Sequence, residues 1–264
     1  MNGESTLPER YEQLRLRVRE ACEAAGRPAD SVAILAVSKT FPAAQVLELA
    51  SLGQRAFGES YLQEALAKIE ACEAGRQDAL AGRRATMAGG PDAAGSATSE
   101  QPAPFERPLE WHFIGPIQSN KTRPLAERFD WVHSIDRERI ARRLSEQRPE
   151  GLAALNVCVQ VNVSGEASKS GCAPEECPEL ARQVAALPGL RLRGLMTIPA
   201  PSEDAAVQRA QFARLRELFE RLRGEGLGLD TLSMGMSDDL EAAVAEGSTL
   251  VRVGSALFGS RPRK

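Results

Sequence analysis

The stretch VAILAVSKT, residues 32–40, decides the fold of this chain. Its first six residues are all apolar, which is typical of a parallel strand that is buried on both faces. The polar triplet Ser38-Lys39-Thr40 then marks the end of that strand. A helical pattern follows over residues 42–52, with Pro42 in its first turn. A strand followed at once by a helix is the repeating unit of α/β folds.

The same unit recurs along the rest of the chain. Further strands are predicted at 55–58, 111–114, 131–134, 156–161, 190–196, 231–233 and 249–253, and helices at 60–74, 121–129, 137–147, 174–187, 203–223, 238–246 and 255–258. An additional helix precedes them, beginning at a capping box formed by Thr6 and Glu9. Eight strands that alternate with helices predict a single (β/α)8 TIM barrel. A doubly wound open sheet is the alternative, although no GxGxxG motif supports its dinucleotide-binding form.

One segment, residues 75–108, breaks the alternation. It is rich in Gly, Ala, Ser and Pro and has almost no large apolar residue. Such a segment cannot bury enough apolar surface to order itself, so we expect a mostly disordered loop without a function of its own. The predicted organisation is therefore one domain over residues 1–264, with an insertion at about 75–108.

Composition excludes several classes of protein. The 264 residues include 33 basic and 36 acidic side chains, a net charge of -3, which argues against binding nucleic acid through bulk electrostatics. No apolar run is long enough to span a membrane, and the first residues lack the pattern of a secretory signal. We expect a cytoplasmic protein with neither nucleic-acid nor membrane partners.

The five cysteines are predicted to be free thiols. Their odd number and irregular spacing do not fit a disulfide framework. Cys172 and Cys177 lie close together in sequence, but the only two histidines, His112 and His133, are distant from them. A zinc site is therefore not expected, and a three-histidine metal centre is impossible.

In a (β/α)8 barrel the active site lies at the carboxyl ends of the strands, where Lys39 follows six apolar residues. Poor solvation lowers the pKa of a lysine and makes its free amine a nucleophile. Two ordinary interpretations remain open. Lys39 could extend from the barrel mouth into water, or it could pair with Glu59 at the end of the next strand.

The last two strands end in loops that suit a phosphate group. The first loop carries Gly235, Met236 and Ser237, and the second carries Gly254 and Ser255. Barrels often bind phosphate in these two loops, although the serines could equally be simple helix caps. A nucleophilic lysine beside a phosphate cup is what pyridoxal 5'-phosphate (PLP) requires.

Arg252, two residues before Gly254, is a candidate partner for the pyridine ring of such a cofactor. Arginine stays protonated, so it disfavours a protonated ring nitrogen and weakens the ring as an electron sink. The alternative is a structural ion pair with a carboxylate at the barrel rim.

Six long motifs resemble the YggS/PROSC family of pyridoxal phosphate homeostasis proteins. They are LAVSKTFPA (35–43), FGESYLQE (57–64), LEWHFIGPIQSNK (109–121), VNVSGEASKSG (161–171), LRGLMTIPAP (192–201) and LSMGMSDDLEAAVAEGSTLVRVGSALFG (232–259). The resemblance implies a fold-type III barrel like the N-terminal domain of alanine racemase. It also implies PLP bound as a Schiff base to Lys39, a phosphate cup that includes Met236, Ser237, Gly254 and Ser255, and Arg252 beside the ring nitrogen. Ser60 stands where the family has Asn, and Ser255 where Thr is common.

The sequence is consistent with three functions. The favoured one is a non-catalytic, monomeric carrier that buffers PLP for vitamin B6 homeostasis and hands it to apo-enzymes. The second is an amino-acid racemase, which needs two bases. In alanine racemase the second base is a Tyr of the partner subunit, whose C-terminal β domain helps to build the dimer. Here Tyr11 and Tyr61 are the two tyrosines, and that β domain is expected to be absent. The third is a barrel enzyme for a phosphorylated sugar. Lys169 is either a second PLP site or a solvated loop residue.

Overall fold

The computed structural model describes residues 5–87, 107–166 and 168–259. Eight parallel strands close into a barrel in chain order, with β8 paired back onto β1. The strands are β1 (Ala33–Val37), β2 (Ala56–Glu59), β3 (Glu110–Phe113), β4 (Trp131–Ile135), β5 (Leu155–Gln160), β6 (Leu190–Met196), β7 (Thr231–Ser233) and β8 (Leu250–Val253). The predicted (β/α)8 barrel is confirmed, and the open-sheet alternative is wrong.

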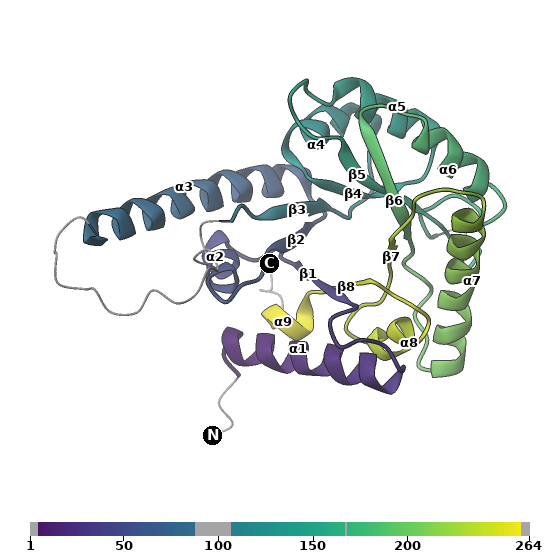
Figure 1. The fold of residues 1–264 in the computed structure, drawn as a ribbon, viewed down its shortest axis with the longest axis horizontal. Coiled ribbons are helices and arrows are strands. Elements are labelled where there is room, and N and C mark those ends of the chain that lie inside the picture. The colour runs from purple at the N-terminus through teal and green to yellow at the C-terminus, as the bar shows by residue number, and fades with distance from the viewer. Residues whose placement is uncertain (1–4, 88–106, 167, 260–264) are drawn as a thin grey trace.

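Helices surround the barrel in Figure 1. They are α1 (Leu7–Ala24), α2 (Ala43–Ser51), α3 (Leu62–Met87), α4 (Thr122–Arg128), α5 (Glu138–Gln147), α6 (Cys177–Ala185), α7 (Ala205–Gly224), α8 (Leu240–Ala245) and α9 (Ser255–Phe258), with a short 3-10 turn at Ser119–Lys121. The predicted capping box of α1 is confirmed. The Thr6 side chain accepts from the Glu9 backbone N–H, and the Thr6 N–H donates to the Glu9 carboxylate over 2.8 Å.

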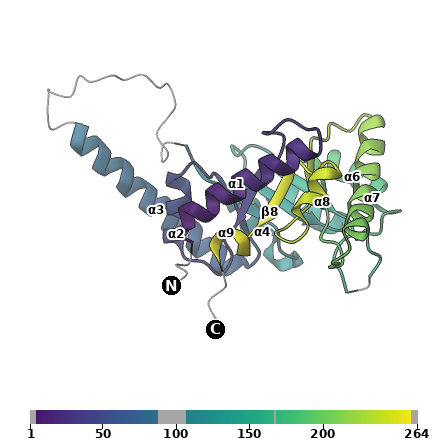
Figure 2. The ribbon, with the colours of Figure 1, turned by 90° about the horizontal axis from the view of Figure 1, so that it is seen from below.

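Helix α3 corrects the predicted loop at 75–108. The helix continues to Met87 rather than ending near Ala74, and Figures 1 and 2 show its second half extending away from the barrel. The segment after Gly75 lacks an apolar stripe, but Ala, Leu, Arg and Gln dominate it and have high helix propensity. The scarcity of apolar residues in this segment therefore did not mean that it lacks regular structure. The rest of the predicted insertion, residues 88–106, lies outside the described residues.

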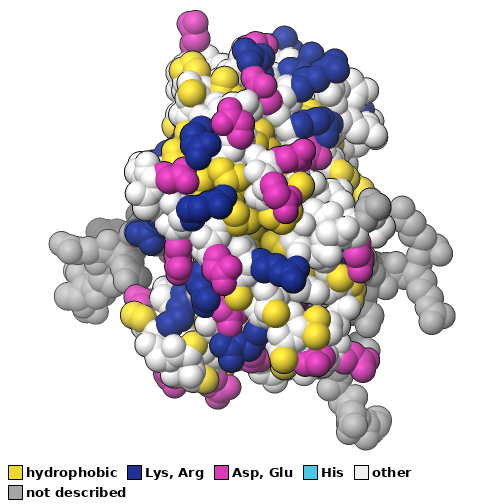
Figure 3. All heavy atoms as spheres, turned by 90° about the vertical axis from the view of Figure 1, so that its right-hand side faces the viewer, with side chains coloured by type: hydrophobic (Ala, Val, Ile, Leu, Met, Phe, Trp, Pro, Cys, Tyr) yellow, Lys and Arg dark blue, Asp and Glu magenta, His cyan; other side chains and the backbone are white. Residues whose placement is uncertain are grey.

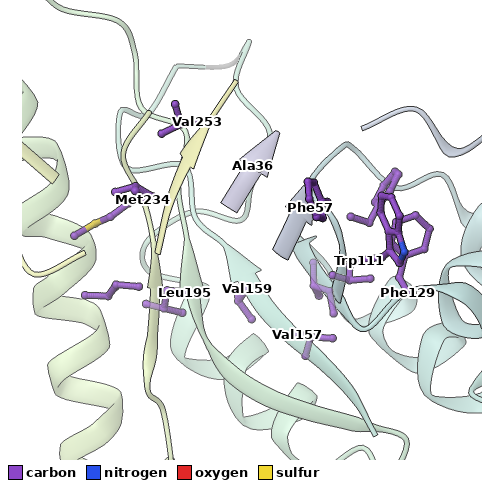
Figure 4. Close-up of a cluster of buried hydrophobic side chains, with 14 of the residues drawn as sticks. Ala36, Phe57, Trp111, Phe129, Val157, Val159, Leu195, Met234 and Val253 are labelled. Atoms are coloured by element: carbon purple, nitrogen blue, oxygen red, sulfur yellow. The ribbon is translucent and has the colours of Figure 1, made fainter. Parts of the chain in front are cut away.

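The main hydrophobic core lies between the barrel and its helices. Figure 4 shows side chains from the strands, among them Phe57, Trp111 and Val157, in this layer. A smaller cluster of Trp131, Cys158 and Met196 is separate from it. All five cysteines are buried free thiols, as predicted, and among the described residues no group of three or more His, Cys, Asp or Glu is placed to hold a metal.

The surface carries charges of both signs. Figure 3 shows basic and acidic side chains interspersed on one face of the molecule. Some of them are paired, as in the contact between Arg182 and Glu225 at 2.8 Å. In the part of the chain that is described, no helix combines the length and the hydropathy that a membrane span needs.

Candidate functional site

Lys39 lies two residues after Val37, the last residue of β1, and is half-buried. In the barrel β1 lies between β8 and β2, so the lysine emerges beside the carboxyl ends of both strands. The next residue, Thr40, has a φ of 70°, a conformation that β-branched residues rarely adopt. The Thr40 N–H donates to Glu64 Oε1 over 2.5 Å, which holds this strained turn in place.

The residue on the other side of Lys39 is held by the same helix, α3. Lys68 Nζ donates to the backbone oxygen of Ser38 and to Glu59 Oε1, both over 2.7 Å, and to Glu64 Oε1 over 3.0 Å. The Lys68 and Glu59 side chains are 5% and 0% exposed. Burial raises the pKa of Glu59, and Lys68 opposes that rise. Glu59, the expected alternative partner of Lys39, is thus engaged by Lys68.

We expect the change Lys68→Met to lower the free energy of unfolding by about 3 kcal/mol, because it leaves the Glu59 carboxyl group buried without its cation. The double variant Lys68→Met, Glu59→Gln should recover most of the loss, since it buries no unpaired charge. Urea unfolding of the three proteins measures both effects. Equal losses in the single and double variants would contradict this account.

The two predicted phosphate loops meet at the barrel mouth. The hydroxyl oxygens of Ser237 and Ser255 lie 3.4 Å apart. Gly235 has a φ of 95°, and a Cβ there would lie 2.6 Å from the Cβ of Ala243. A Cβ on Gly254 would lie 3.4 Å from the backbone oxygen of Val37, so the second loop runs against β1. The cup is therefore next to β1, the strand that precedes Lys39.

Neither serine caps a helix by its side chain. The N-cap of α8 is Asp239 and that of α9 is Gly254, and neither cap makes a side-chain cap hydrogen bond. Asp239 Oδ1 instead accepts from the Met236 N–H over 2.5 Å and shapes the first loop. The simple-capping alternative for Ser237 and Ser255 is therefore wrong.

The lysine turn and the cup are packed together. Phe41, two residues after Lys39, stacks on Phe258 of α9 with ring centroids 4.7 Å apart and planes 18° apart. From α1, Arg10 Nε donates to the backbone oxygen of Leu257 over 2.7 Å. Helix α9, which Ser255 begins, is thus fixed relative to the turn that carries Lys39.

Arg252 is a buried cation inside the barrel, 3% exposed. Its Nη1 donates to the backbone oxygen and the hydroxyl of Ser233 over 2.5 and 2.9 Å, and its Nη2 donates to the backbone oxygen of Thr197 over 2.7 Å. Burial lowers the pKa of Arg252 to about 10, so the group remains protonated at neutral pH. The described partners of its guanidinium are hydroxyl and backbone oxygens rather than carboxylates, so the rim ion-pair alternative is wrong.

The remaining candidates are spread around the molecule. Lys169 is half-buried in the loop after β5, across the barrel from β1. Tyr11 is buried and donates to Gln54 Oε1 over 3.2 Å. Tyr61 is 54% exposed and, with Thr40, lines a cavity of about 640 Å³. This cavity borders the lysine turn.

Sequence reasoning missed the residues that hold the site. Glu64 and Lys68 were not singled out, although Lys68 stands among the apolar residues Ala65, Ile69 and Cys72 on one side of α3. A lysine within an apolar stripe is a signal of a buried ion pair. Ser233 was noted only as a strand residue, because its bond to Arg252 depends on barrel register.

The residues at the mouth fit pyridoxal phosphate. That cofactor needs a primary amine for its aldehyde, donors for its phosphate and a partner for its ring nitrogen. Lys39, the paired hydroxyls of Ser237 and Ser255, and the buried cation of Arg252 offer these three kinds of group. Fold and site together define a barrel of the alanine racemase N-terminal domain class.

Comparisons with known proteins agree with this class. The family model "Alanine racemase, N-terminal domain" matches residues 10–262. The chain is 58% identical over 257 residues to the pyridoxal phosphate homeostasis protein of Pseudomonas aeruginosa, covering 97% of this chain and 96% of that one. The chain belongs to the pyridoxal phosphate homeostasis protein family.

Solved structures lead to the same family. PipY of Synechococcus elongatus, solved with PLP bound, is 34% identical with a TM-score of 0.73, over 96% of this chain and 100% of that one. Alanine racemase from Corynebacterium glutamicum shares the fold at 17% identity and a TM-score of 0.62, over 96% of this chain and 62% of that one.

Proposed function

We propose that this chain binds PLP through Lys39 and acts as a non-catalytic carrier that buffers the cofactor for vitamin B6 homeostasis and passes it to apo-enzymes. The observation that carries the proposal is the packing of the lysine turn against the cup formed by Ser237 and Ser255. PipY, a relative by sequence and fold, has been solved with PLP bound. We propose that the carrier is a monomer.

Each side chain would have a separate role. When bound, the cofactor supplies an aldehyde that condenses with a primary amine and releases water. Lys39 would provide that amine. The hydroxyls of Ser237 and Ser255, with the backbone of Met236 and Gly254, would bind the phosphate. The Arg252 cation would face the ring nitrogen and disfavour its protonation.

The same arrangement argues against turnover of amino acids. A cation beside the ring nitrogen weakens the ring as an electron sink, and racemisation needs a second base opposite Lys39. Tyr11 is buried and bound to Gln54. A racemase remains the second candidate because Tyr61 lines the cavity beside Thr40.

One experiment separates the carrier from the racemase. The PLP-loaded protein is incubated with L-alanine in deuterated water, and loss of the Cα–H signal is followed by NMR. A parallel sample is mixed with an apo-enzyme that depends on PLP. We expect negligible exchange and recovery of the enzyme's activity. Rapid exchange that Tyr61→Phe abolishes would instead establish the racemase, with Tyr61 as its second base.

A further inference from the structure

A chain of polar side chains crosses the inside of the barrel from Arg252. Arg252 Nη1 lies 2.9 Å from Ser233 Oγ, and Ser233 Oγ lies 2.8 Å from His133 Nδ1. His133 Nε2 lies 2.8 Å from His112 Nδ1, and His112 Nε2 lies 2.7 Å from Glu110 Oε1. β7, which carries Ser233, and β4, which carries His133, are not neighbours in the barrel. This series of hydrogen bonds therefore spans the barrel interior, which in this fold is usually filled by apolar side chains.

The Arg252 end fixes the direction of these hydrogen bonds. A guanidinium can only donate, so Ser233 Oγ accepts from it. Ser233 is fully buried, and its hydroxyl oxygen has only Arg252 and His133 as side-chain partners in the described structure. The Ser233 proton is therefore donated to His133 Nδ1. A neutral His133 must then carry its own proton on Nε2 and donate it to His112 Nδ1.

At its other end, Glu110 requires the same direction of hydrogen bonding. An ionised carboxylate only accepts, so His112 Nε2 donates to Glu110. Burial lowers the pKa of both histidines, and the charge of Arg252 adds to this effect at His133. The bond to His112 lowers the pKa of Glu110. Two neutral Nε2–H rings thus link a cation to a carboxylate with every bond satisfied.

We propose that Ser233, His133, His112 and Glu110 are positioning residues for the cofactor site: they form one directed hydrogen-bond chain that fixes the Arg252 guanidinium and connects its charge to the Glu110 carboxylate at the opposite end of the barrel. This inference rests on the proposed function, because Arg252 is the group assigned to the ring nitrogen. A set of side chains that only filled the barrel interior would not require the same tautomer at both histidines.

The first test reads the tautomers without cofactor. The chain has only two histidines, so long-range ¹H–¹⁵N NMR spectra of the apo-protein at neutral pH report both rings without ambiguity. We expect the Nε2–H form in both. In the double variant Ser233→Ala, Glu110→Ala, neither end of the hydrogen-bond chain fixes its direction, and we expect His133 to gain a substantial Nδ1–H population. A proton on Nδ1 of either ring in the wild type would overturn the inference.

The second test measures release of PLP from the loaded protein. Glu110→Ala should release it roughly tenfold faster, the equivalent of one hydrogen bond to a charged group. Glu110→Gln keeps an acceptor oxygen and should restore most of the retention. Glu127→Ala is the matched control, since the Glu127 and Glu110 side chains are 41% and 47% exposed. Unchanged tautomers in the double variant, or unchanged release in Glu110→Ala, would overturn the role. Failure of the wild type to take up PLP would refute the proposed function, while the tautomers would still be measured.

Discussion

Replacing Lys39 by Ala is expected to abolish covalent retention of PLP and with it the visible absorbance band of the loaded protein. The amine of Lys39 is the group proposed to bond the aldehyde, and the other described lysine next to β1, Lys68, is engaged by Glu59 and Glu64. The fold should survive, because Lys39 is half-buried at the end of its strand rather than part of the core. Absorbance spectra after gel filtration, with thermal unfolding as the test of folding, measure both expectations.

Borohydride reduction and peptide mapping provide the control. The chain has only five lysines, so the labelled peptide identifies the residue directly. Lys68 is buried, and its amine is held by Glu59, Glu64 and the backbone oxygen of Ser38, so we do not expect it to be labelled. Lys169→Ala should leave the label on Lys39. Label found mainly on Lys169 or Lys121 would refute the assignment.

The barrel was predictable because its signal is local. Each strand is a short apolar run bounded by turn residues, and each is followed by a helical pattern. The residues proposed for the site could also be predicted from the sequence. Once a barrel is assumed, its strand ends converge, and Lys39, Ser237 and Ser255 all follow strand ends. Chain order places β8 next to β1, so the last loop had to lie near the lysine.

The supporting residues were not predictable, because their partners come from distant parts of the sequence. His133 and Ser233 are 100 residues apart and meet only because the barrel closes. The sequence suggested no role for the two histidines beyond metal binding, which their distance from Cys172 and Cys177 argued against. The length of α3 was missed for a different reason. Helix propensity without an apolar stripe gives no periodic signal, and the helix after Gly75 is of this kind.

Changes at Arg252 are expected to have the largest effects on both stability and chemistry. Arg252→Glu would place a carboxylate against the backbone oxygens of Ser233 and Thr197, which now accept from the guanidinium. An unpaired buried charge of this kind costs about 3–5 kcal/mol, so we expect this variant to unfold at much lower urea. Arg252→Gln is the better probe of chemistry, because its amide N–H groups can still donate to one of these oxygens.

In PLP-loaded Arg252→Gln, loss of the positive charge should allow the ring nitrogen to become protonated and strengthen the electron sink. We expect exchange of the Cα–H of L-alanine in deuterated water to rise at least about tenfold over the wild type, a change of about 1.4 kcal/mol in the barrier. Arg252→Lys is the matched control. It keeps the cation but has fewer donors, so retention of PLP should fall while exchange stays at the wild-type level. Equal exchange in the Gln and Lys variants, with retention unchanged in both, would mean that Arg252 does not contact the ring.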